Sequence, residues 1–361
     1  MDPEGDEAGV ERDTAATVKN IVICCDGTGN EVNANEYTNV VKLYRRLSRE
    51  DPARQINYYD PGLGTLGTPG FRTRTFTSLT RLLGLAFGYG IHENVKDAYL
   101  FLMRNYEDGD RIFLFGFSRG AYTVRALAGL LFRVGLLESG NDQLVEHALK
   151  RYFEPVRREP DWKGMARFKK IFCRACPIHF VGVWDTVNSV GVLRGSSKLP
   201  HTADMSGVTN GRHAVSLNEK RSKFRTNLWE KPNGHEFAQV WFAGVHADVG
   251  GSYADAGLSD IALEWMLVEA AKFGMLIETA DDPGLAPNPH GQMHNPLLPL
   301  WWLLGWRRRK IYPLPGGQPV WVHDSVRERR EKDSRFDQRC AKQIRQPFEY
   351  VKTAGRRPVS P

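Results

Sequence analysis

The sequence contains no uninterrupted run of about 20 apolar residues, so no segment of it is a candidate for a helix that spans a bilayer. The first seven residues, Met1 to Glu7, are acidic and lack the basic and apolar blocks of a secretory signal peptide. We therefore expect a cytoplasmic protein that begins with a flexible acidic arm over residues 1–17. Export by a route without a signal peptide remains open, as does a peripheral contact with a membrane.

Cysteines are few and odd in number, five in 361 residues, which argues against a disulfide framework. Cys24 and Cys25 are adjacent within an apolar run, as expected of reduced core residues. Cys173 and Cys176 have the spacing of a metal or redox pair, but no second pair follows at the spacing of a zinc finger. The stretch from Gly62 to Gly67 has the glycine pattern of a dinucleotide loop without the helix that should follow it. We predict no metal and no cofactor.

A strongly basic body is also absent. The chain has 49 basic and 42 acidic residues, but 15 basic and only 6 acidic ones lie from Arg307 onward, so this region carries a net charge of +9. The excess therefore lies in the C-terminal region, and the preceding 306 residues have a net charge of −2. This distribution argues against nucleic-acid binding over the protein surface.

What the sequence does contain is an alternation of buried strands and helices. A continuous, β-branched apolar run ends at Cys25, further strand-like runs end at Phe115, Trp184 and Phe242, and segments with helical periodicity lie between and after them. This pattern predicts an α/β protein of the α/β-hydrolase type: a mainly parallel sheet with helices on both faces, helical insertions and a basic C-terminal tail. The predicted divisions are a catalytic domain over 18–280, with insertions at about 137–175 and 186–235, and a Trp-rich and basic extension over 281–361. The polar insertion 186–235 is a candidate lid.

The strongest chemical signal is Gly116-Phe-Ser118-Arg-Gly120, placed between a predicted strand and a predicted helix. A nucleophile on such a sharp turn needs small neighbours on both sides, and the turn lifts its hydroxyl out of the sheet. The motif therefore predicts a nucleophile elbow with Ser118 as the nucleophile. The alternative is a tight turn whose serine caps the following helix.

A serine nucleophile needs a base and an acid that orients the base. His246 follows the strand that ends at Phe242, and Asp185 follows the strand that ends at Trp184. Their order in the chain is that of the α/β-hydrolases, and the ends of parallel strands meet at one edge of a sheet. We predict His246 as the base and Asp185 as the acid. Asp248 is the second candidate acid, although a role in anchoring its loop is favoured.

The tetrahedral intermediate needs two donors for its oxyanion. We expect one from the backbone N–H of Arg119, at the start of the helix after the elbow, and the other from Gly27 or Thr28, where the first strand ends. Asp26 is expected to close the turn there. A divalent ion held by Asp26 and Asp248 is the alternative for these two carboxylates.

The segment from Pro296 to Lys310 joins tryptophans to a run of cations: Trp301, Trp302, Trp306, Arg307, Arg308 and Arg309. Indole rings and cations together suit the headgroup region of a membrane. We therefore predict a peripheral membrane contact through these residues. The alternative is a loop that plugs the core.

Five blocks of the sequence give it a family resemblance. They are Ile23–Asn30, Tyr58–Thr65, Gly116–Thr123, Val183–Val187 and Trp241–Gly251. On these blocks the chain resembles the α/β-hydrolase domain family that includes the type VI secretion phospholipase effectors of the first lipase class. The resemblance implies Ser118, Asp185 and His246 as the catalytic triad, and phospholipid acyl esters as the substrate class.

Together these features predict a serine hydrolase that cleaves carboxylic esters of lipids or phospholipids through an acyl-enzyme intermediate. The alternative is a catalytically silent hydrolase fold that binds a membrane or a partner.

Overall fold

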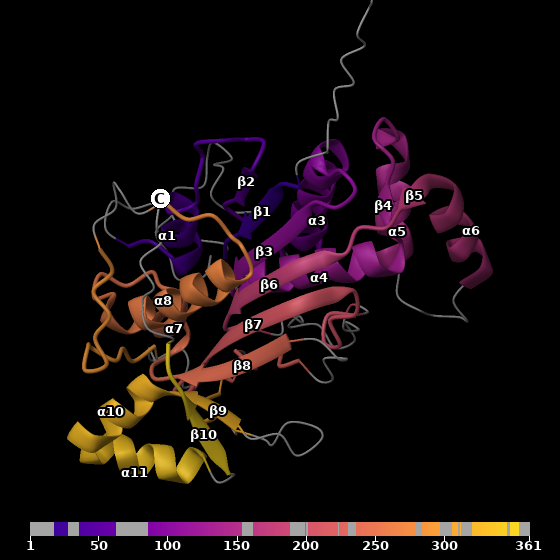
Figure 1. Ribbon diagram of the computed structural model, residues 1–361. Coiled ribbons are helices and arrows are strands. Elements are labelled where there is room, and N and C mark those ends of the chain that lie inside the picture. Colours follow the sequence, from indigo (N-terminus) through magenta and orange to yellow (C-terminus); the bar gives the residue numbers. More distant parts are fainter. Residues whose placement is uncertain are drawn as a thin grey trace, which may run out of the picture.

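An eight-stranded sheet with helices packed around it organises the protein, seen in a computed structural model (Figure 1). The structure describes residues 18–27, 36–62, 86–153, 162–187, 199, 201–222, 224–229, 236–278, 284–296, 305–309, 311, 320–344 and 347–353. The strand order is β10-β9-β8-β7-β6-β3-β1-β2, and every neighbouring pair is parallel. The predicted fold class, α/β and α/β-hydrolase-like, is confirmed.

The strands of this sheet are β1 Asn20–Cys25, β2 Gln55–Asp60, β3 Arg111–Phe117, β6 Ile178–Trp184, β7 Val208–Ser216, β8 Glu236–Phe242, β9 Val320–His323 and β10 Phe348–Val351. The described helices are α1 Asn39–Arg45, α3 Ala86–Asn105, α4 Arg119–Arg133, α5 Val145–Phe153, α6 Trp162–Phe172, α7 His246–Gly250, α8 Gly257–Lys272, α10 Asp324–Lys332 and α11 Ser334–Gln343, with a short 3₁₀ turn, η1, at Asp142–Leu144. The two-residue strands β4 Leu136–Leu137 and β5 Cys173–Arg174 form a separate antiparallel pair.

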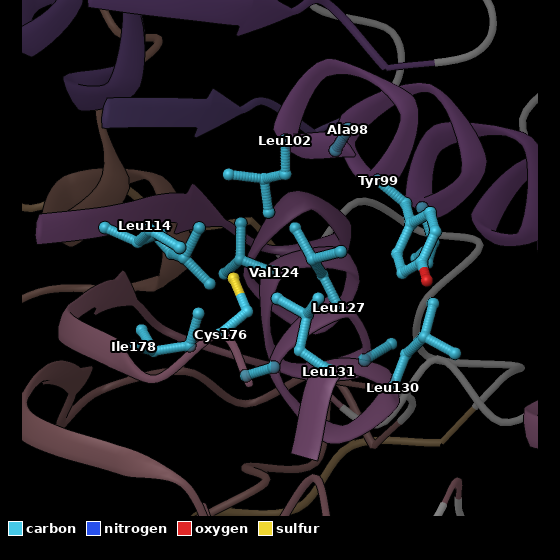
Figure 2. Packing of buried hydrophobic residues seen from close by; sticks show 14 of the residues in the cluster. Ala98, Tyr99, Leu102, Leu114, Val124, Leu127, Leu130, Leu131, Cys176 and Ile178 are labelled. Atoms are coloured by element: carbon cyan, nitrogen blue, oxygen red, sulfur yellow. The ribbon is translucent and has the colours of Figure 1, made fainter. Parts of the chain in front are cut away.

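One face of the sheet packs against α3 and α4, and α5 packs against these two helices in the same cluster. Leu102 of α3, Leu114 of β3 and Val124 of α4 point toward one another in this core, which Figure 2 shows from close by. Cys176 lies in the same cluster, and burial raises the pKa of its thiol well above the ordinary value. All five cysteines are free thiols. The opposite face packs against α1, α7 and α8 in a second cluster.

The long insertion predicted at 186–235 contains a central strand of the sheet. β7 lies between β6 and β8, so the prediction of a lid is wrong for the residues of this strand. The strand escaped prediction because its buried residues include polar ones. Arg212 pairs with Glu269 on α8, and His213 contacts Gln239 on β8, so partners distant in the sequence make burial of these side chains favourable.

The C-terminal region continues the sheet. β9 pairs with β8, and β10 pairs with β9, while α10 and α11 cover a third apolar cluster that includes Val322, Phe336 and Cys340. The boundary predicted at residue 280 therefore does not separate the C-terminal region from the sheet. The arm predicted over residues 1–17 lies outside the described residues. In the part of the chain that the structure describes, no helix is both long and apolar enough to cross a bilayer.

Candidate active site

Three of the predicted site residues follow strands of the same parallel sheet. Ser118 follows β3, Asp185 follows β6, and His246 begins α7 a few residues after β8. Because β3, β6, β7 and β8 all run in parallel, the segments that leave their carboxyl ends share one edge of the sheet.

The turn at Ser118 has the strained geometry of a nucleophile elbow. Ser118 has φ 56° and ψ −113°, outside the regions that serine ordinarily occupies. A Cβ on Gly116 would lie 2.5 Å from the Gly120 carbonyl oxygen, and a Cβ on Gly120 would lie 2.0 Å from the Cys25 carbonyl oxygen. The two glycines therefore let α4 begin directly against the end of β1, and this close packing holds the strained turn in place.

The side chain of Ser118 is left available by this geometry. It makes no capping hydrogen bond to α4, so the alternative of a helix-capping serine is wrong. Its backbone N–H donates to the Trp184 carbonyl oxygen at 3.2 Å, which places the elbow beside the residue that precedes Asp185. Among the described residues the hydroxyl has no hydrogen-bond partner. In unliganded active sites the hydrogen bond between a nucleophile and its base is often long, and it tightens when substrate is bound.

Asp185 and His246 form a close, buried pair. The His246 Nδ1 donates to the Asp185 Oδ2 at 2.5 Å, and the carboxylate is fully buried. Since a carboxylate only accepts hydrogen bonds, this contact leaves Nε2 as the nitrogen that can take up a proton. The imidazole lies between two aromatic rings, with its centroid 4.6 Å from that of Phe117 and 5.0 Å from that of Phe224.

The Asp185 carboxylate is saturated with hydrogen bonds. Oδ1 accepts from the Ser216 N–H at 2.9 Å and from Arg309 at 2.5 Å, while Oδ2 accepts from His246 and, at 3.0 Å, from Arg309. Burial alone would raise the pKa of Asp185, but the positive charge of Arg309 and the hydrogen bond from His246 hold that pKa well below its usual range. Asp185 is therefore a charged acceptor at any ordinary pH.

Glu219 is a further acidic residue at this site, and the sequence analysis did not find it. It is buried, accepts the His246 backbone N–H at 3.2 Å, and pairs with Arg221 at 2.8 Å. Burial opposes its charge, but the hydrogen bond and charge of Arg221 lower the pKa of Glu219 to about 2. Nothing in the sequence indicates that this glutamate, one of several polar residues in its stretch, contacts the backbone of His246. The contact depends on the packing of α7 against the end of β7.

Arg309 is the main correction to the predicted membrane contact. It is buried, 8 % exposed, and its guanidinium holds Asp185 instead of facing outward. Arg307 and Arg308 are exposed, and Trp306 is 48 % exposed, so these three keep the placement that the prediction needs. Trp301 and Trp302 lie outside the described residues.

The predicted oxyanion donors differ in their availability. Arg119 is the first residue of α4, so its backbone N–H belongs to the helix terminus beside Ser118. The Gly27 N–H donates to the Asp26 carboxylate at 2.6 Å, so it would have to leave that carboxylate to serve as the predicted oxyanion donor. Thr28, the other residue predicted there, lies outside the described residues.

Asp26 and Asp248 each have structural partners of their own. Asp26 accepts from the Thr38 hydroxyl at 2.6 Å and from the Tyr59 hydroxyl at 3.1 Å, as expected of a residue that closes a turn. Asp248 accepts from the Val245 N–H at 2.9 Å and from the His294 ring at 2.7 Å, which anchors the loop before α7. The second candidate acid therefore contacts a different histidine from His246. No cluster of three or more potential metal ligands occurs among the residues that the structure describes.

Comparison with protein families gives one match that covers most of the chain. Residues 19–269 match the model described as "T6SS, Phospholipase effector Tle1-like, catalytic domain". Ser118, Asp185, Glu219 and His246 lie within that range, whereas His294 and Arg309 lie beyond it.

A curated relative and two solved structures are similar to the chain. The uncharacterized protein YEL023C of Saccharomyces cerevisiae is 41 % identical over 219 residues, which are 57 % of this chain and 32 % of that protein, so the chain spans about a third of its length. An uncharacterized protein from Pseudomonas aeruginosa is 21 % identical, with a TM-score of 0.42 over 76 % of this chain and 48 % of that one. The Tle1 effector, solved bound to the VgrG spike of the type 6 secretion system, is 18 % identical, with a TM-score of 0.35 over 66 % of this chain and 52 % of that one.

Proposed function

Because the chain belongs to the family of Tle1-like phospholipase effector catalytic domains, we propose that it hydrolyses acyl esters of phospholipids through a Ser118–His246–Asp185 triad. The family assignment supports hydrolysis of lipid esters. The observation that carries the triad is the buried hydrogen bond between His246 and Asp185, formed at the sheet edge where Ser118 occupies its strained turn. The other predicted role, a catalytically silent binding module, does not account for this arrangement.

In the proposed reaction, the Ser118 hydroxyl attacks the carbonyl carbon of the ester while His246 Nε2 accepts the hydroxyl proton. The oxyanion that forms lies at the start of α4 and accepts a hydrogen bond from the Arg119 backbone N–H. The imidazolium then gives its proton to the departing alcohol, which leaves an acyl-enzyme on Ser118. Water attacks this ester with His246 again as the base, and the fatty acid departs as the Ser118 hydroxyl is restored.

The surroundings of His246 favour its role as a base. The pKa of His246 is lowered, and burial is the largest cause. Arg221 also lowers this pKa, whereas the hydrogen bond and charge of Asp185 and the charge of Glu219 raise it without reversing the shift. Because only the neutral imidazole can accept the serine proton, activity should be lost as the pH falls through this lowered pKa.

We therefore predict that the acidic limb of the pH profile of kcat/KM has its midpoint below 6.5, the ordinary value for histidine. The measurement is hydrolysis of a soluble ester between pH 4 and 9. A midpoint well above 6.5 would contradict the proposed environment of the base.

The proposed substrate surface is a membrane that contains anionic lipid. Trp306, Arg307 and Arg308 are exposed next to the segment 219–222 that contacts His246. The pKa of Lys220 is lowered first by burial and then by the positive charges of Arg339 and Arg308, which lie close to it. Several cations therefore gather at this place. Such a group of cations next to an exposed indole suits phosphate headgroups.

For the membrane contact, we predict that Trp306→Ala combined with Arg308→Gln lowers hydrolysis of vesicles of phosphatidylglycerol and phosphatidylcholine by about tenfold. Hydrolysis of a short soluble ester should stay within twofold of wild type, because neither side chain touches the triad. Fatty-acid release from both substrates is the measurement. Equal loss on the two substrates, or no loss on vesicles, would remove the membrane contact from the account.

A further inference from the structure

Arg309 reaches the active site from outside the part of the chain that matches the family model. The match ends at residue 269, and β9 and β10, which follow Arg309, add the last two strands of the sheet. The residue that most fully contacts the candidate catalytic acid is thus supplied by the C-terminal region.

Backbone contacts hold the Arg309 segment in place. Residues 305–309 run antiparallel to the segment after β7, with an isolated bridge between Arg221 and Trp306. The Arg307 N–H donates to the Lys220 carbonyl oxygen at 2.7 Å, and the Ser222 N–H donates to the Gly305 carbonyl oxygen at 3.2 Å. This pairing starts beside Glu219 and fixes the position from which the Arg309 side chain enters the core.

The Arg309 guanidinium donates hydrogen bonds to both oxygens of the Asp185 carboxylate. Nη1 lies 2.5 Å from Oδ1 and Nη2 lies 3.0 Å from Oδ2, a two-point contact that fixes the plane of the carboxylate. Nη1 also contacts the Ser216 hydroxyl at 2.6 Å, and Nη2 donates to the Phe224 carbonyl oxygen at 2.8 Å. Arg309 therefore orients Asp185, which accepts the His246 proton. It also holds the backbone of Phe224, whose ring packs against the imidazole.

We propose that Arg309 is a positioning residue of this hydrolase site, which aims Asp185 at His246 and offsets the carboxylate charge so that the imidazole stays neutral at lower pH. This inference rests on the proposed function. It assigns a catalytic contribution to the C-terminal region, which the five blocks of the family resemblance do not include.

The charges around His246 give the direction of the effect. Asp185 from the end of β6 and Glu219 from the end of β7 are negative, while Arg221 and Arg309 are positive. Removing the charge of Arg309 leaves two carboxylates against one guanidinium. The pKa of His246 should then rise, and the enzyme should lose activity at a higher pH than wild type does.

The test compares Arg309→Gln, Arg309→Lys and the control Arg335→Gln, which removes an exposed cation from α11. On a soluble ester, Arg309→Gln should move the acidic midpoint of kcat/KM upward by about one pH unit and lower kcat by about 10- to 100-fold, with KM nearly unchanged. Arg309→Lys keeps the charge but not the two-point contact, so kcat should fall with little movement of the midpoint. Arg335→Gln should match wild type.

Wild-type profiles and turnover in both Arg309 variants would overturn the inference while leaving the proposed function intact. If Arg309→Gln does not fold, Arg309→Lys decides by the same criterion: wild-type turnover overturns the inference, and reduced kcat at unchanged KM and midpoint supports it. A direct titration of His246 by NMR, in the Ser118→Ala background, tests Arg309 without any turnover. The pKa of His246 should be higher with Arg309→Gln, and an unchanged pKa would overturn the inference even if the hydrolase assignment failed.

Discussion

Ser118→Ala is expected to lower kcat for ester hydrolysis by about 10⁴-fold or more. The hydroxyl is the proposed nucleophile, and alanine offers no atom that can form the acyl-enzyme. The Ser118 side chain has no hydrogen-bond partner among the described residues and does not cap α4, so its removal should leave stability nearly unchanged. The loss should therefore appear in turnover and not in the melting temperature.

The matched control for this prediction is Ser334→Ala, which removes an exposed serine hydroxyl from the start of α11. It should retain wild-type turnover. The measurements are fatty-acid release from a phospholipid and a thermal melt of each variant. Turnover within tenfold of wild type in Ser118→Ala would show that another group performs the chemistry.

Gly120→Ala is expected to have the largest effect on stability, a loss of about 3 kcal/mol or more. The new Cβ would lie 2.0 Å from the Cys25 carbonyl oxygen and 2.7 Å from that of Asp26. These are backbone atoms at the end of β1, which is paired on both sides in the sheet, so they cannot move aside as the end of a flexible side chain can. Either α4 shifts away from β1, or the elbow opens and Ser118 leaves its position.

Gly284→Ala is the control for this prediction, because a Cβ there meets none of the described residues within 4 Å and Gly284 has no positive φ. It should change the free energy of unfolding by less than about 0.5 kcal/mol. Urea denaturation of both variants gives the comparison. A Gly120→Ala protein as stable as the Gly284→Ala protein would contradict the close packing of α4 on β1.

Three strands that end at the candidate site were predictable, because the sequence of each is itself apolar enough to indicate a buried strand. β1, β3 and β6 are mostly apolar, as strands of a sheet covered on both faces are, and each is followed directly by a polar residue: Asp26, Ser118 and Asp185. Ser118 and Asp185 therefore stood out by position as well as by type. Their placement at one edge follows from the parallel topology alone.

The missed features depend on contacts between distant residues. β7 contains buried Arg212 and His213, whose partners lie on α8 and β8, so its polar sequence hides a central strand. Arg309 lies in a run of cations in which Arg307 and Arg308 are exposed, and nothing in the local sequence distinguishes it from them. Only the pairing of residues 305–309 with the segment after β7 turns this one side chain inward.

The most direct measurement of the central claim is peptide mapping, by mass spectrometry, of the protein after reaction with a fluorophosphonate. The account predicts one covalent adduct per chain, on Ser118, which is lost in Ser118→Ala and formed more slowly in His246→Ala. An adduct on another residue, or full hydrolytic activity in a protein that forms none, would contradict it.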